Sequence, residues 1–267
     1  MEKTKQKLEV SDKIMYQLGL KVGSINTQYT KEILEYYDKD IFQYIELFIP
    51  VGSYKDTIDY WRQFHIPFGI HAPHTAAGMN LANPADYAAN KAKIEETIRF
   101  ADSLDASYII FHSGTNGKIE EPVRQLSPYA DDRFLLENKP IKGFGGNYIC
   151  LGTDYKQLKA MTDALHCGFC LDFGHAICAA NTLKKNPIEF IAELKELNPR
   201  VYHLTDGEYK SEIDSHYHYG KGTFPLKELL AFVPEGGKIT NEAKRDNMAS
   251  LQEFYLDSIA LDGYTES

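Results

Sequence analysis

Short apolar runs alternate with longer segments of helical periodicity along the chain from about residue 17 onward. Amphipathic segments predict helices at residues 83–104, 155–166, 188–197 and 246–260, the first of them opened by an Asn83-Pro84 cap. Residues 113–132 hold two prolines and little periodicity, so the helix of that repeat is expected to be short or missing. The apolar runs predict eight strands, at 17–24, 44–50, 68–71, 108–112, 133–137, 168–172, 200–204 and 237–242.

Strand–helix alternation repeated eight times predicts an α/β fold, a single (β/α)8 TIM barrel. A doubly wound open sheet is the alternative, but no G-x-G-x-x-G motif follows the first strand. No linker rich in Pro, Gly or Ser and no shift in composition divides the chain. We therefore expect one TIM-barrel domain over residues 1–267, with the barrel proper at about 17–262.

The composition narrows the class of protein. Hydrophobic residues make up 43% of the chain and charged residues 25%, as in soluble globular proteins, and no apolar run approaches the ~20 residues of a membrane span. The polar start, residues 1–13, lacks the apolar core of a secretory signal, and four cysteines do not form a disulfide scaffold. A cytoplasmic protein is therefore expected. The net charge of −9 argues against a protein that binds a nucleic-acid backbone through its overall charge.

The candidate chemistry lies where the strands end. Strands three to eight all finish in an imidazole or a carboxylate, and in a barrel these positions converge on one mouth, where active sites are built. These residues are His71, His112, Glu137, Asp172, His203 and Glu242. Shortly after strands six and seven come His175, Asp206, Asp214 and His216.

Imidazole with carboxylate is the ligand set of zinc, manganese or iron. A single ion takes three or four protein groups, so about nine candidates imply two or three ions that share bridging carboxylates. Paired ions can activate water and stabilise an in-line displacement at phosphorus.

At these residues the sequence resembles the endonuclease IV and xylose isomerase-like TIM barrels, from about residue 18 to 246. The flanking sequence segments that match the motifs of the family are Ile70-His-Ala-Pro73, Met79-Asn-Leu-Ala-Asn-Pro84, Phe111-His-Ser-Gly114 and Leu136-Glu-Asn138. The resemblance to endonuclease IV implies three zinc ions held by nine side chains. It would assign His71, His112 and Glu137 to the first ion, Glu137, Asp172, His203 and Glu242 to the second, and His175, Asp214 and His216 to the third.

The resemblance fails where endonuclease IV handles DNA. That family carries a loop rich in Gln, Arg and Trp after its second strand, whereas residues 50–56 here contain no arginine and no tryptophan. The family also places an aromatic residue three positions after its first histidine ligand, and this chain has His74 there. Both departures disfavour abasic DNA as the substrate.

Two further interpretations stay open. A sugar or sugar-phosphate isomerase or epimerase of the same superfamily needs one ion, held by the equivalents of Glu137, Asp172, His203 and Glu242, to polarise a carbonyl and a hydroxyl. The surplus histidines would then bind sugar hydroxyls. A metal-binding barrel without turnover is the third interpretation.

We favour a multinuclear phosphoester hydrolase that acts on a small sugar-phosphate or nucleotide-like substrate. The expected cofactors are divalent ions, zinc in the first place and up to three of them, with manganese or magnesium as alternatives. Glu137 and Glu242 are the expected catalytic residues. The expected substrate contacts are His74, Asp206, His218 and Lys244.

Overall fold

The computed structural model describes residues 16–143 and 147–265. The expectation that residues 1–13 form no secretory signal concerns a segment outside this described part. The ends of the expected 1–267 domain lie outside it as well.

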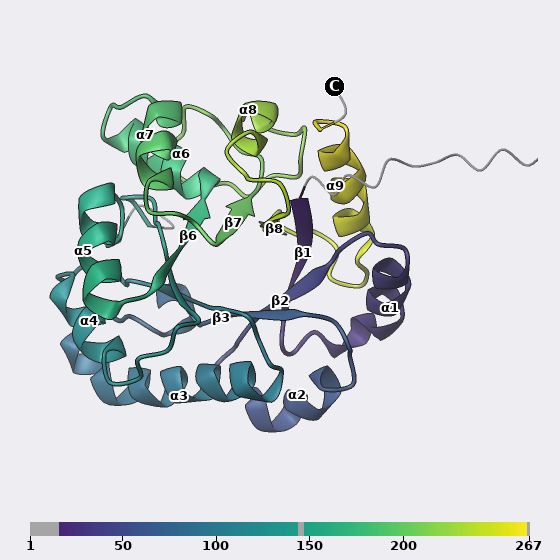
Figure 1. The fold of residues 1–267 in the computed structure, drawn as a ribbon, viewed down its shortest axis with the longest axis horizontal. Helices are drawn as coiled ribbons and strands as arrows, with labels where there is room; N and C mark the ends of the chain where they lie inside the picture. Colours follow the sequence, from purple (N-terminus) through teal and green to yellow (C-terminus); the bar gives the residue numbers. More distant parts are fainter. Residues whose placement is uncertain (1–15, 144–146, 266–267) are drawn as a thin grey trace, which may run out of the picture.

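Eight parallel strands close into a barrel in the order of the sequence, which confirms the predicted (β/α)8 TIM fold. Figure 1 shows the strands around the centre and the helices on the outside. The strands are β1 (Tyr16–Gly23), β2 (Tyr44–Phe48), β3 (Phe68–His71), β4 (Ile109–His112), β5 (Phe134–Glu137), β6 (Gly168–Asp172), β7 (Val201–Leu204) and β8 (Gly237–Asn241).

The outer layer consists of helices that follow the strands, with two of them, α6 and α7, between β6 and β7. Helix α9 returns beside α1, where Tyr36 stacks on Tyr255, and so covers the seam between the first and last repeats. The helices are α1 (Thr30–Asp38), α2 (Tyr54–Trp61), α3 (Tyr87–Ser103), α4 (Glu120–Leu126), α5 (Tyr155–Leu165), α6 (Phe173–Thr182), α7 (Pro187–Lys195), α8 (Leu226–Leu230) and α9 (Gln252–Asp262), with short 3-10 helices at Thr27–Tyr29, Thr75–Ala77 and Pro84–Asp86.

The predicted elements differ from the observed ones mainly at their ends. The irregular fourth repeat does carry a helix, the seven-residue α4, as expected for a short one. The predicted helix at 246–260 was placed too early, because α9 begins only at Gln252. The Glu253 side chain accepts hydrogen bonds from the backbone N–H groups of Asp246 and Asn247, and Asn247 accepts one from Ala249. These side-chain bonds hold the segment in turns that compete with a helix.

The strand register sets the level of the side chains at the mouth. His112 on β4 pairs with Glu137 on β5, and Asp172 on β6 pairs with His203 on β7. Paired residues of neighbouring parallel strands point to the same face of the sheet. The register therefore brings the polar strand ends together at one height inside the barrel. Among the described helices, none is both long and apolar enough to cross a lipid bilayer.

Below this level the barrel interior is filled by tyrosine rings that need glycine neighbours. A Cβ atom on Gly19 would lie 2.3 Å from the ring of Tyr44, and one on Gly69 would lie 2.0 Å from the ring of Tyr108. Both rings are buried, and their hydroxyl groups bond to Thr240 and Glu46. The two glycines thus make room for the aromatic layer that supports the mouth.

We predict that Gly69→Ala lowers the free energy of unfolding by about 1–3 kcal/mol, because the added methyl group must displace a fully packed tyrosine. Urea denaturation measures the change. Gly263→Ala is the matched control, since its new Cβ would meet its nearest neighbour, the Ala260 carbonyl oxygen, at 3.4 Å. The control should stay within about 0.5 kcal/mol of the wild type. Equal stability of the two variants would contradict this account of the interior.

Candidate metal centre

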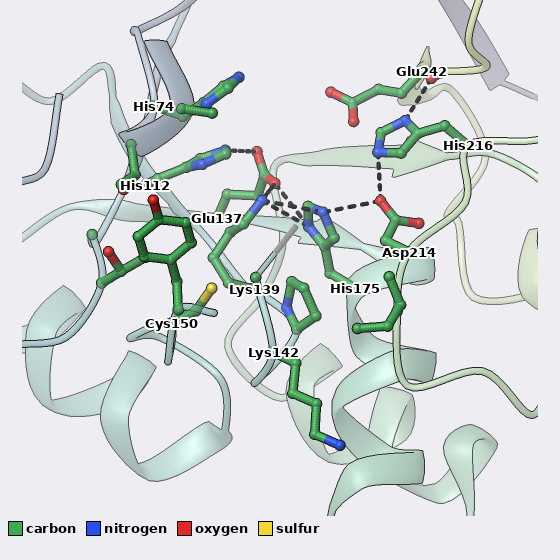
Figure 2. A pocket seen from close by; sticks show the side chains of 18 of the residues that line it. His74, His112, Glu137, Lys139, Lys142, Cys150, His175, Asp214, His216 and Glu242 are labelled. Carbon is green, nitrogen blue, oxygen red and sulfur yellow. Dashed lines mark hydrogen bonds and ion pairs between the residues drawn. The ribbon is translucent and has the colours of Figure 1, made fainter. Parts of the chain in front are cut away.

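The strand ends surround the carboxylate of Glu137, which is 1% exposed at the end of β5. Its Oε2 atom lies 3.1 Å from Nε2 of His71 and 3.1 Å from Nε2 of His112. Its Oε1 atom lies 3.0 Å from Nδ1 of His175, which stands in the first turn of α6. One buried carboxylate therefore faces imidazoles from three different elements, and Figure 2 labels two of them, His112 and His175.

A second group converges on His203 at the end of β7. Its Nδ1 atom lies 2.9 Å from an oxygen of Glu242, 3.5 Å from one of Glu137 and 4.0 Å from one of Asp172. This nitrogen is buried, and despite these short distances it makes no hydrogen bond to any described residue. A buried polar atom without a hydrogen bond costs free energy. The position of this nitrogen among three carboxylates is therefore suited to a bound cation.

The third group lies on the opposite side of the cavity from His74. Nε2 of His175 is 3.5 Å from Oδ2 of Asp214, and Nε2 of His216 contacts the same oxygen. His216 has a φ of +50°, in the left-handed region. Such a backbone conformation is uncommon for a residue other than glycine and is often found at functional sites.

The outer ring nitrogens of two of these histidines, His71 and His216, are held by hydrogen bonds. Nδ1 of His71 donates to the Ala72 carbonyl at 2.8 Å, and Nδ1 of His216 donates to the Glu242 carbonyl at 2.7 Å. Each bond places a proton on the outer nitrogen and turns the inner nitrogen towards a carboxylate. A ring nitrogen and a carboxylate oxygen in such contact need a proton or a metal ion between them, and metal-binding histidines typically have their other nitrogen held in this way.

Asn138 fixes the position of the neighbouring ligand strand. Its side chain donates to the Asp172 carbonyl at 2.8 Å and accepts from the Asp172 N–H at 2.7 Å. The Asn138 carbonyl in turn accepts a hydrogen bond from Nδ1 of His175 at 3.0 Å. One buried amide therefore holds the ends of β5 and β6 together.

The crowding of charge shifts the ionisation of the metal-free groups. Burial is the main cause that raises the pKa of Asp172 to about 6. The positive charge of His175 acts in the opposite direction, and the negative charge of Glu242 raises the pKa further. Burial alone would lower the pKa of His175, but the charge of Asp172 and the hydrogen bond to Asp214 bring it to about 10. Burial and the charge of His71 lower the pKa of His74 to about 3, so this ring is neutral.

The structure brings the nine expected metal ligands together in this way. Of the four expected substrate residues, two line the cavity and two do not. His74 and Lys244 line the cavity. Asp206 does not line it, because its carboxylate accepts backbone N–H bonds from Gly207, Gly220, Gly222 and Phe224. His218 does not line it either, and its Nδ1 atom bonds to Asp257.

Three charged residues belong to the site although they were not among its expected members. Lys21 contacts Glu242 and lies 3.1 Å from Glu46, while Lys139 lies 3.2 Å from Glu137. Glu46 interrupts an otherwise apolar strand, and this charge was the signal that could have revealed it. Lys21 is the charged residue of β1 and lies between Leu20 and Val22. Lys139 follows a ligand strand by two residues, a position near the mouth of a barrel.

A cavity of about 840 Å³ opens above these groups. It is lined by ligand residues together with Phe48, Lys142 and Tyr148. The volume lies within the range of sites for small molecules, about 300–1,000 Å³.

Comparison with known proteins gives a family and a fold. A model of the xylose isomerase-like TIM barrel family matches residues 39–253. A probable endonuclease 4 from Thermoplasma volcanium is 28% identical over 185 residues, which cover 63% of this chain and 64% of that protein. The chain thus spans less than two thirds of the length of this relative.

Two solved structures share the barrel. A D-tagatose 3-epimerase-like protein superimposes with a TM-score of 0.70 at 20% identity, covering 92% of this chain and 97% of the other. Endonuclease IV from Thermus thermophilus does so with a TM-score of 0.68 at 16% identity, covering 94% and 99%. At these identities the likeness concerns the fold alone.

We predict that zinc raises the melting temperature of chelator-stripped protein, because ions would offset the repulsion among the buried carboxylates. Binding at 100 times the dissociation constant stabilises a fold by about 2.7 kcal/mol. Asp214→Asn should reduce the rise, since it removes a charge from the third group. Asp163→Asn, which alters an exposed pair with Lys159, is the control and should keep the full rise. Differential scanning fluorimetry measures each, and an undiminished rise in Asp214→Asn would contradict the assignment.

Proposed function

Since the chain belongs to the xylose isomerase-like TIM barrel family, we propose that it is a divalent-metal-dependent enzyme that hydrolyses a phosphoester. The proposed substrate is a small sugar phosphate or a nucleotide-like molecule. The observation that carries this proposal is the grouping of ligands around Glu137, which faces His71, His112 and His175 at 3.0–3.1 Å.

This grouping offers more ligands than one ion requires. A single ion held by Glu137, Asp172, His203 and Glu242 would leave two sets unused. These sets are His71 with His112, and His175 with Asp214 and His216, and both are close enough to hold an ion. The excess supports two or three ions, with Glu137 shared between neighbouring positions.

The donor set fits zinc, because the atoms that face the centre of the site are imidazole nitrogens and carboxylate oxygens. Hydrogen bonds to the opposite ring nitrogens hold some of these imidazoles in place. Divalent ions bound here would supply an activated water molecule and stabilise charge on the phosphoryl oxygens. Glu137 and Glu242 would hold the geometry of the cluster from β5 and from the end of β8. Neutral His74 and the ammonium group of Lys244 would contact the substrate from the cavity wall.

The size and the lining of the cavity support a small anionic substrate. Four lysines, at positions 21, 139, 142 and 244, line a cavity of about 840 Å³ in a chain whose net charge is −9. A phosphate group is attracted to such a set of ammonium groups. Abasic DNA is the less favoured substrate, because residues 50–56 lack the arginine and tryptophan side chains that the resemblance to endonuclease IV would require.

One observation favours a second candidate, a metal-dependent sugar or sugar-phosphate isomerase or epimerase. Lys21 and Lys139 already place two positive charges against Glu242 and Glu137. They offset part of the negative charge of the cluster, so fewer divalent ions are needed for neutrality. A single ion, with carboxylates that move a proton between adjacent carbons, would then suffice.

The deciding experiment counts the ions and follows the products. Elemental analysis should give two or three zinc ions per chain, and sugar phosphates or nucleotides should release inorganic phosphate. A single manganese ion with interconversion of ketoses, and no phosphate release, would replace the proposal with the isomerase. A gel assay on a duplex with an abasic site tests DNA directly. Ion binding without any turnover would indicate a binding module and overturn both candidates.

We predict that Glu137→Gln loses bound metal and lowers kcat/KM by more than about 100-fold, because Glu137 is shared by several ligand groups. Glu193→Gln, which changes an exposed glutamate on α7 that pairs with Lys185, is the matched control and should retain both the bound metal and the activity. Elemental analysis and phosphate release measure the two variants. An active and fully metallated Glu137→Gln would refute the bridging role.

A further inference from the structure

Glu46 lies on β2, inside the barrel and below the ligand groups, and its side chain is 0% exposed. A buried carboxylate costs several kcal/mol of desolvation unless it is paired and hydrogen-bonded. An apolar residue would fill this position in a packed interior at less cost. The presence of a carboxylate here must therefore be explained by the contacts of Glu46.

One oxygen of Glu46 receives three donors from three different parts of the barrel. Its Oε2 atom accepts hydrogen bonds from the Tyr108 hydroxyl at 2.8 Å, the Thr240 hydroxyl at 2.9 Å and Nε2 of His203 at 3.0 Å. Burial would raise the pKa of Glu46, but the charges of His203 and Lys21 hold it below its usual range. A carboxylate can only accept, so Nε2 of His203 carries the proton.

This bond decides what the other nitrogen of the ring offers. With Nε2 directed at Glu46, Nδ1 of His203 points at the oxygens of Glu242, Glu137 and Asp172. The arrangement has the form of a carboxylate–histidine–metal triad, in which the outer acid fixes the ring and makes it a stronger ligand. His71 has a backbone carbonyl as its outer partner instead.

The second oxygen of Glu46 reaches another ligand of the same group. Its Oε1 atom lies 3.1 Å from Nζ of Lys21, and the same ammonium group contacts Glu242. Glu46 is thus joined to His203 directly and to Glu242 through Lys21. Both of those residues belong to the group around Nδ1 of His203.

We propose that Glu46 is a positioning residue that orients His203 directly and Glu242 through Lys21, and so sets the affinity of this ligand group for its divalent ion. The proposal rests on the metal site of the proposed function, but it holds for a hydrolase and for an isomerase alike. It requires no contact between Glu46 and the substrate.

Zinc titration of the full chain against a competing chelator tests the proposal. Glu46→Gln keeps the shape but removes the charge, and it should weaken the binding of one ion about 10–100-fold. Tyr108→Phe is the matched control, because it removes another donor to the same oxygen and leaves the Glu46–His203 pair in place. It should bind zinc as the wild type does. Unchanged affinity in Glu46→Gln, or an equal loss in Tyr108→Phe, would overturn the proposal.

A second measurement separates positioning from support of the fold. In chelator, the melting temperature reports the stability of the metal-free barrel, and the rise on adding zinc reports the ligand group. Glu46→Gln should lose part of the zinc-induced rise, whereas a merely structural role would lower only the metal-free value. If Glu46→Gln fails to fold because Lys21 has lost one of its carboxylate partners, the double variant Lys21→Met with Glu46→Gln removes both charges, and it too should bind one ion about 10–100-fold more weakly.

The outcomes also distinguish this proposal from the proposed function. A wild-type chain that binds zinc but releases no phosphate would refute the hydrolase and leave the Glu46 measurement decisive. A wild-type chain that binds no divalent ion would overturn the Glu46 proposal together with the metal site.

Discussion

The side chains at the mouth of the barrel keep several carboxylates out of water within a few ångströms of one another, and this costs free energy. Glu46, Glu137 and Asp172 are all at most 5% exposed. Imidazoles, two lysines and, on our proposal, divalent ions supply the positive charge that makes the arrangement stable. The fold positions each of these partners, and the proposed chemistry uses the same charges.

Two features of the barrel make such a cluster possible. The parallel register brings strand ends from distant parts of the chain to one level, so that His112 lies beside Glu137 and Asp172 lies beside His203. The layer below is packed with tyrosines beside Gly19 and Gly69, and it contains Glu46 as an outer hydrogen-bond partner. The polar mouth therefore rests on a packed, buried layer that also contributes to its charge.

The family leaves two reactions open, hydrolysis and isomerisation, and the number of ions bound at the site would separate them. The chain belongs to the xylose isomerase-like TIM barrel family, is similar in sequence to a relative named as a probable endonuclease, and shares its fold with a protein named as epimerase-like. On our proposals, hydrolysis and isomerisation would both use Glu137, Asp172, His203 and Glu242 as ligands. They would differ in whether the additional histidines hold ions or substrate, so the number of bound ions would separate them.

The sequence by itself determined the barrel and most of the mouth. Strand and helix periods are local patterns, and the rule that barrel strand ends converge turned six separate residues into one predicted site. The tertiary structure alone decided that Asp206 and His218 bond within the protein instead of lining the cavity. It alone joined Glu46 to His203, which lies 157 residues away in the chain. Periodicity tells which face of a strand is buried, but the partner of a buried charge depends on how distant segments pack, and no local pattern encodes that.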